Sequence, residues 1–133
     1  MAVEALDHVN IMTDRLDETA NFYAEVLGLE RRDSPSGNRS DVSQWMHDET
    51  GRAIIHLNAA ECPRPFDRAF ERGVPTGAVH HVALRVTGFA RVSQALEERG
   101  APFQVNHIKA ANLRQIFVTD PNQVLLELNF FEA

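Results

Sequence analysis

A strand pattern followed by a helix pattern opens the chain. Residues 5–12 alternate in polarity and predict a strand with His8 and Asn10 on one face, because successive strand side chains point to opposite sides. Apolar side chains then recur at helical spacing over residues 16–27, and Gly28 follows where a helix end favours glycine. The opening segment is therefore predicted to be a strand followed by a helix.

The remainder of the first half contains a charged segment, two strand patterns and a long irregular stretch. Residues 30–38 are charged and turn-rich, which predicts a loop. Segments 43–47 and 53–58 predict two strands joined by a tight turn. Residues 60–77 are rich in Pro and Gly without a regular period, and we expect a connector there with one helical turn near residues 66–70.

The second half of the chain begins with the same patterns. A strand pattern precedes an amphipathic helix pattern, and three further strand patterns follow. The predicted elements are a strand at 78–86, a helix at 89–99, and strands at 103–106, 114–118 and 124–130.

The residues themselves repeat between the two halves. Residues 7–9 (Asp-His-Val) match residues 80–82 (His-His-Val) at an offset of 73, and residues 55–58 match residues 126–129 at an offset of 71. A steady offset near 72 indicates an internal duplication. We therefore predict an α+β fold of two tandem βαβββ modules that form a curved mixed β-sheet.

The duplication also predicts how the chain is divided. We expect a single domain over residues 1–133, with module 1 at about 1–59, a connector at about 60–77 and module 2 at about 78–133.

Composition and charge exclude several classes of function. The 133 residues are 44% hydrophobic and 24% charged, which is typical of a globular domain. A net charge of −6 argues against nucleic acid as a partner. No apolar run reaches the roughly 18 residues that a membrane span needs, and no signal pattern opens the chain. The single cysteine, Cys62, fits a reducing compartment, so we expect a cytoplasmic protein with no membrane partner.

Four metal-competent side chains occupy repeated positions. His8 and His81 lie in the first predicted strands of the two halves, and His56 and Glu127 lie in the last. A lone carboxylate among apolar residues, as in the Glu127 strand, is costly to bury unless a cation or another partner compensates it. Imidazole and carboxylate together suit a divalent transition metal ion, and the pattern predicts one metal site built from both halves.

Sequence motifs in both halves carry a family resemblance. They are Leu6-Asp7-His8-Val9 with residues 21–29 (Asn-Phe-Tyr-Ala-Glu-Val-Leu-Gly-Leu), and residues 117–122 (Phe-Val-Thr-Asp-Pro-Asn) with residues 126–128 (Leu-Glu-Leu). The chain resembles the vicinal oxygen chelate superfamily, which includes glyoxalase I, extradiol ring-cleavage dioxygenases, methylmalonyl-CoA epimerase, and fosfomycin- and bleomycin-resistance proteins. The resemblance covers nearly the whole chain.

The resemblance implies a ligand set of His8, His56, His81 and Glu127 around one divalent ion (Fe, Ni, Zn, Mn or Co). Glyoxalase I usually has a carboxylate, and the epimerase a glutamine, where this chain has His56. The dioxygenases match His8, His81 and Glu127 as an iron-binding triad and use a further histidine as acid or base, a role open to His56. His56 is therefore expected to be either a ligand or an acid/base.

Three functions follow as expectations from the resemblance. The first is a metal-dependent, glyoxalase-like lyase or isomerase that acts on a small oxygen-chelating metabolite through a metal-stabilised, enediolate-like anion. In that reaction Glu127 or His56 moves the proton. The alternatives are an extradiol-type Fe(II) ring-cleavage dioxygenase and a metal-free small-molecule binding or resistance protein.

Further candidate residues lie outside this ligand set. Asn10 and Trp45 are expected to line the substrate site, and Arg114 to bind a substrate carboxylate through both of its terminal nitrogens. His107, expected in a loop, is a candidate proton shuttle. We expect a homodimer for two reasons: unpaired edges of the modules favour pairing between chains, and the resemblance implies dimers in which modules pair edge to edge.

Overall fold

The duplication predicted from the sequence is present in the pairing of the strands. The computed structural model describes residues 2–71 and 73–132. The chain divides into two units, Met1–Ala24 with Gly28–Arg72 and Glu25–Leu27 with Gly73–Ala133. Each unit contains one four-stranded sheet, and the two sheets have the same strand order. This agrees with the predicted α+β fold of two tandem modules.

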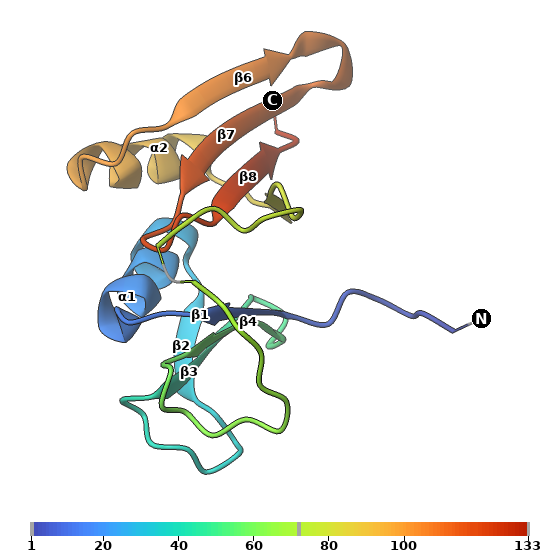
Figure 1. Ribbon diagram of the computed structural model, residues 1–133. Coiled ribbons are helices and arrows are strands. Elements are labelled where there is room, and N and C mark those ends of the chain that lie inside the picture. Colours follow the sequence, from blue (N-terminus) through green and yellow to red (C-terminus); the bar gives the residue numbers. More distant parts are fainter. Residues whose placement is uncertain (1, 72, 133) are drawn as a thin grey trace. The chain divides into compact units, whose positions relative to one another are not determined.

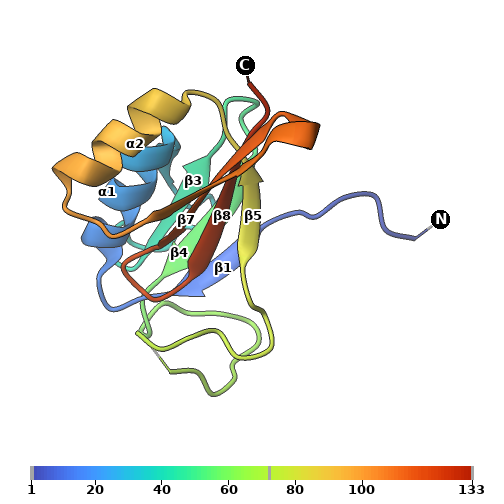
Figure 2. The same ribbon diagram turned by 90° about the horizontal axis from the view of Figure 1, so that it is seen from above.

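The first module contains one helix and a mixed sheet of order β1-β4-β3-β2. β1 runs parallel to β4, and the other neighbours are antiparallel. Figure 2 shows β1 beside β4. The elements are β1 (Val9–Met12), α1 (Leu16–Leu27), β2 (Glu30–Asp33), β3 (Ser43–His47) and β4 (Ala53–Asn58).

The second module repeats this arrangement with the order β5-β8-β7-β6. β5 runs parallel to β8, and the remaining pairs are antiparallel; Figure 1 shows β6, β7 and β8 in sequence. The elements are β5 (Val82–Arg85), α2 (Phe89–Glu98), β6 (Gln104–Ile108), a 3₁₀ turn (Lys109–Ala111), β7 (Leu113–Thr119) and β8 (Leu125–Phe130).

The hairpins that lead into β4 and β8 have the same turn. In the first, the Asp48 amide donates to the Arg52 carbonyl at 2.9 Å; in the second, the Asp120 amide donates to the Val124 carbonyl at 2.9 Å. The carboxylate of each aspartate also accepts backbone N–H groups of the turn. Both turns require a positive φ, at Gly51 (86°) in the first and at Gln123 (68°) in the second. The repeat therefore includes the turn geometry as well as the strands.

The helices form where the apolar periodicity predicts them, and each buries its apolar face. Ala20 and Tyr23 of α1 and Val92 and Leu96 of α2 are fully buried. α1 ends at Leu27 and is followed by Gly28, whose φ of 71° lies in the left-handed region that favours glycine. Across the described ranges, neither helix is long and apolar enough to cross a membrane.

Several details of the predicted elements are wrong. Residues 30–33, predicted as loop, form β2, an exposed and charged edge strand without apolar alternation. The first strands are shorter than predicted, because their ladders begin at Val9 and Val82. His8 and His81 therefore precede their strands by one residue. Residues 66–70 form no helical turn.

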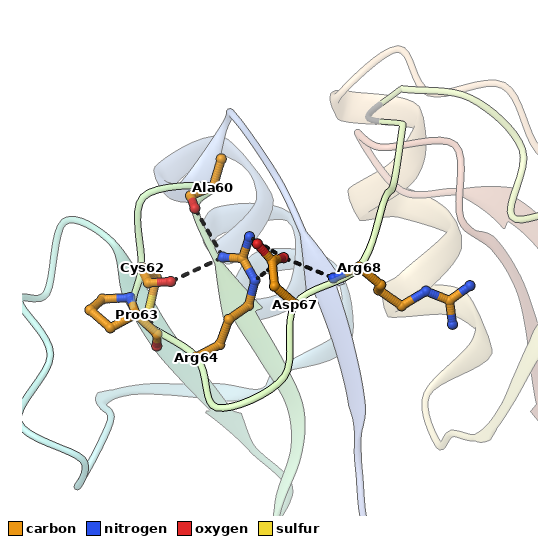
Figure 3. Close-up of polar contacts among 6 residues, drawn as sticks. All are labelled: Ala60, Cys62, Pro63, Arg64, Asp67 and Arg68. Carbon is orange, nitrogen blue, oxygen red and sulfur yellow. Dashed lines mark hydrogen bonds and ion pairs between the residues drawn. The ribbon is translucent and has the colours of Figure 1, made fainter.

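The chain around residues 60–68 is organised instead by one arginine (Figure 3). Arg64 donates to the carbonyls of Ala60 and Cys62 at 2.9 and 3.0 Å and pairs with Asp67 at 2.8 Å. The Arg64 guanidinium also lies 5.7 Å from the ring centroid of Phe70. Side-chain contacts, rather than regular secondary structure, therefore hold this part of the connector.

Candidate metal and substrate site

The strand register places His56 and Glu127 at equivalent points of the two sheets. Asn10 of β1 is opposite His56 of β4, and Ala83 of β5 is opposite Glu127 of β8. On the neighbouring antiparallel strands, Trp45 is opposite His56 and Phe117 is opposite Glu127. The two side chains matched by sequence offset are therefore also matched by hydrogen-bonded register.

The candidate residues of the first module form a stack of three rings. The His56 ring lies between His8, at a centroid distance of 3.7 Å and an interplanar angle of 12°, and Trp45, at 3.9 Å and 8°. His8 precedes β1, while Trp45 and His56 belong to β3 and β4. The structure thus brings together three residues that the sequence singled out.

This environment affects the protonation of His56. The side chain is buried, and burial, followed by the nearby His8, lowers the pKa of His56 below its ordinary value. A neutral imidazole keeps one nitrogen lone pair for a metal ion or a proton. His56 is therefore suited to either role that the resemblance implies.

His8 is oriented by its neighbour in the chain. The Nδ1 of His8 lies 2.5 Å from Oδ2 of Asp7, and this contact is the main reason that the pKa of Asp7 is lowered. A carboxylate bound to one imidazole nitrogen fixes the ring orientation and leaves the other nitrogen for a metal ion. In His8 the remaining nitrogen is Nε2.

The candidate residues of the second module form a polar pair. Nε2 of His81 lies 3.7 Å from Oε1 of Glu127. Nδ1 of His81 lies 3.0 Å from Nδ1 of His80. Both residues precede β5, so the alternation of strand side chains does not separate them.

A ladder of amide side chains crosses the second sheet and ends at Glu127. Asn106 Nδ2 donates to Gln115 Oε1 at 2.9 Å, and Gln115 Nε2 donates to Asn129 Oδ1 at 3.0 Å. Asn129 Nδ2 then donates to Glu127 Oε2 at 3.0 Å. β6, β7 and β8 each contribute to this ladder.

The side chain of Asn10 forms a hydrogen bond with Asn58 rather than with a candidate metal ligand. Its Oδ1 accepts a hydrogen bond from Asn58 Nδ2 at 2.9 Å, and Asn58 in turn accepts from the Cys62 thiol at 3.4 Å. Asn10 is exposed and lies beside His56 in the strand register. Its assignment to the substrate site stays a prediction.

Arg114 and His107 lie on the face of the second sheet opposite to Glu127. The Arg114 guanidinium lies 5.1 Å from the ring centroid of Phe89 in α2, and Arg114 is paired across the strands with Phe130. His107 is the cross-strand partner of Arg114 and belongs to β6, so its predicted loop position is wrong. These positions give no support to the roles expected for Arg114 and His107.

Sequence reasoning missed the residues that hold the candidate ligands. Asp7 adjoins His8 in the quoted motif, and Asn129 lies two residues after Glu127 on the same strand face. Both could have been found by asking which neighbour orients each ligand. Gln115 and Asn106 carry no such local signal, because they reach Glu127 only through the pairing of β6, β7 and β8.

The donor set fits a divalent transition metal ion. Among the described residues, no three or more His, Cys, Asp or Glu side chains are gathered in a group that could hold a metal ion. Each module instead holds two candidate ligands. In His8 the Nδ1 is engaged and the Nε2 is left available, and in Glu127 Asn129 engages Oε2 and leaves Oε1. Imidazole with carboxylate is the donor chemistry that such ions accept.

Comparison with known proteins assigns the family. A family model described as the Glyoxalase/Bleomycin resistance protein/Dioxygenase superfamily matches residues 5–128. The chain belongs to this superfamily, which confirms the resemblance read from its motifs.

Individual relatives agree with the family match. A curated protein of Arabidopsis thaliana named "Glyoxylase I 4" is 25% identical over 127 residues, covering 93% of this chain and 69% of the relative. A glyoxalase/dioxygenase structure from Nostoc punctiforme has a TM-score of 0.70 at 15% identity, with 99% and 94% of the two chains covered. A lactoylglutathione lyase structure from Agrobacterium tumefaciens has a TM-score of 0.65 at 18% identity, with 98% and 96% covered. The two structures support the fold.

Proposed function

We propose that this protein is a metal-dependent enzyme of the glyoxalase-like type, with lyase or isomerase chemistry on a small metabolite that carries neighbouring oxygen atoms. The observation that carries the proposal is the placement of ligand-type side chains at equivalent register positions of both modules, His56 in one and Glu127 in the other. In a random fold, such residues would have no reason to share register and sheet position.

His8, His81 and Glu127 are the residues that would hold the metal ion, with His56 as a fourth ligand or as the acid/base. When bound, a divalent ion supplies a Lewis acid for the substrate's oxygen atoms. The chain contributes orientation, through Asp7 on His8 and Asn129 on Glu127. A neutral His56 can take up a proton at a ring nitrogen, and Trp45 at 3.9 Å shields one face of that ring.

The proposal includes a cytoplasmic homodimer. Cys62 is a free and buried thiol, which suits a reducing compartment. β6 is an exposed strand at the end of its sheet, and strand edges of this kind favour pairing between chains. Light scattering of the purified protein tests the predicted dimer directly.

Metal binding is the first test of this function. Purified chain is stripped with chelator and titrated with Co(II), Ni(II), Zn(II) or Fe(II) in calorimetry, beside His8→Ala, Glu127→Ala and the matched surface control Glu97→Gln on α2. We expect about one ion per chain for the wild type and the control, and loss of binding in both site variants. A wild type that binds none of these ions would refute the proposal in favour of a metal-free binding protein.

The reaction class is tested on the loaded protein. Small α-hydroxy carbonyl compounds are incubated in D₂O, and exchange of the carbon-bound hydrogen is followed by NMR, because lyase and isomerase chemistry begins by moving that proton. Exchange that depends on metal and on Glu127 supports the proposal. Oxygen consumption with catechols by the iron form, without such exchange, would instead establish the dioxygenase alternative.

A further inference from the structure

The carboxylate of Glu127 is held at one oxygen only. Asn129 donates to its Oε2 at 3.0 Å, and its Oε1 lies 3.7 Å from His81 Nε2. Glu127 is half-buried in β8, between the buried residues Leu126 and Leu128. The two carboxylate oxygens therefore have different surroundings, one bound by the protein and one beside a candidate ligand.

The chemistry of the carboxylate dictates the direction of the whole ladder. A carboxylate only accepts hydrogen bonds, so Asn129 must present its NH₂ group to Glu127 and keep its carbonyl oxygen for another donor. Gln115 Nε2 supplies that donor at 3.0 Å, and Asn106 Nδ2 satisfies the Gln115 carbonyl at 2.9 Å. Every amide in the ladder thus donates toward Glu127, an arrangement in which successive bonds strengthen one another.

Burial makes this direction hard to reverse. The Gln115 side chain is only 8% exposed. A buried amide turned the wrong way would face like atoms on both sides and lose hydrogen bonds that water could not replace. The amide orientation of Gln115 is therefore fixed. Through the hydrogen bonds of the ladder, it also fixes the orientation of the Asn129 amide and of the Glu127 carboxylate.

In the described part of the first module, the equivalent position has a different set of contacts. Asn58 corresponds to Asn129 and Ser43 to Gln115, because each pair is joined across the same strands. The Asn58 amide donates to Asn10 at 2.9 Å, and His56 is held by ring stacking. The ladder is thus specific to the strand that carries the carboxylate.

We propose that Asn129, Gln115 and Asn106 are positioning residues that hold Glu127 as a fixed, one-oxygen metal ligand through Oε1. This inference rests on the proposed metal site. It also assigns separate roles to Glu127 and His56. Glu127, held in place, binds the ion, and His56 is the group that moves a proton.

The test measures affinity for Co(II) alone, by calorimetry and by the visible absorption of the bound ion. Asn129→Leu keeps side-chain volume and removes the donor, and Gln115→Met does the same one step further from Glu127. We expect Asn129→Leu to weaken Co(II) binding about tenfold or more, as for other residues that orient a ligand, and Gln115→Met to weaken it less. The matched control is Asn58→Leu, which removes an amide at the equivalent position of the first module and is expected to leave Co(II) affinity within about twofold of wild type.

A second measurement uses NMR of the side-chain amides and requires no enzyme assay. In the wild type, Zn(II) should shift the side-chain amide NMR signals of Asn129 and Gln115, and in Gln115→Met the Asn129 shift should shrink. Should Asn129→Leu fail to fold, Gln115→Met and this readout decide the matter. Ladder variants that bind Co(II) as tightly as a metal-binding wild type would overturn the inference alone, whereas a wild type that binds no metal would overturn the proposed function as well.

Discussion

The two modules have one backbone plan and two different solutions for holding a candidate ligand. Both sheets have the same strand order, equivalent registers and the same turn before the last strand. In the first module, the His56 ring is stacked between the rings of His8 and Trp45. In the second module, one carboxylate oxygen of Glu127 accepts a hydrogen bond from Asn129.

The difference follows from the chemistry of the two side chains. A neutral imidazole is flat and tolerates apolar and aromatic neighbours, so stacking can fix the ring while leaving its edge available. A carboxylate in a strand needs hydrogen-bond donors in place of the water it has lost. The two modules therefore share one backbone frame, while each candidate ligand has the neighbours that its own chemistry requires.

Breaking the ring stack should give the largest change in stability. Trp45→Ala removes one face of the sandwich around His56 and leaves a cavity, so we expect a loss of about 2–4 kcal/mol in the free energy of unfolding. Trp45→Phe keeps a ring in place and should lose less than half as much. Urea denaturation followed by circular dichroism measures both, because Trp45 is the single tryptophan and its fluorescence is lost in both variants.

Removing a large ring from any strand could lower stability simply by leaving a cavity, so Trp45→Ala needs a control. The matched substitution in the second module is Phe117→Ala, at the position opposite Glu127. If Phe117→Ala cost as much as Trp45→Ala, the idea that ring stacking distinguishes the first module would be wrong.

Breaking the amide ladder should give the next largest effect. Gln115→Met and Asn129→Leu each leave partners unpaired, and we expect each to cost about 1–2 kcal/mol of stability. Because the two residues share one hydrogen bond at 3.0 Å, the double variant should cost less than the sum of the single variants. A double-mutant cycle by denaturation measures this coupling, and strict additivity would contradict a connected ladder.

The equivalent turns before β4 and β8 should respond in opposite directions when their residues are exchanged. Gln123 has a φ of 68° where the equivalent Gly51 has 86°. Gln123→Gly should relieve an unfavourable left-handed conformation and raise the free energy of unfolding by about 0.5–1 kcal/mol. The reverse exchange, Gly51→Gln, should lower it. Thermal denaturation of both variants checks the sign, and two shifts in the same direction would refute the equivalence of the turns.

The smallest expected effect is the pH dependence that His56 adds to the metal-free protein. Burial lowers the pKa of His56 in the folded state, whereas the unfolded chain has the ordinary value near 6.5. As pH falls through about 6.5, the unfolded state therefore binds the proton first, and stability decreases toward acidic pH. His56→Gln should show a flatter dependence between pH 7 and 5 in chelator-treated denaturation series, and an unchanged slope would contradict the burial of a neutral ring.

Much of the architecture could be predicted from local sequence. The helix over residues 16–27 and the strands at 43–47 and 53–58 agree with the structure to the residue. The charged edge strand at 30–33 was missed, because all four of its residues are charged and mostly exposed and so lack the apolar alternation that burial imposes. Pattern reading therefore succeeds where one face is buried and fails at the sheet edge.

The candidate ligands, the duplication and the family could be recognised from the sequence by itself, because they depend on residue type and spacing along the chain. Only the tertiary structure decided how those ligands are held. Asn58 reaches Asn10 across 48 residues of sequence, and Gln115 reaches Asn129 across 14. Such contacts depend on which strands pair and in which register, and that pairing is set by the burial of whole sheet faces rather than by any short motif.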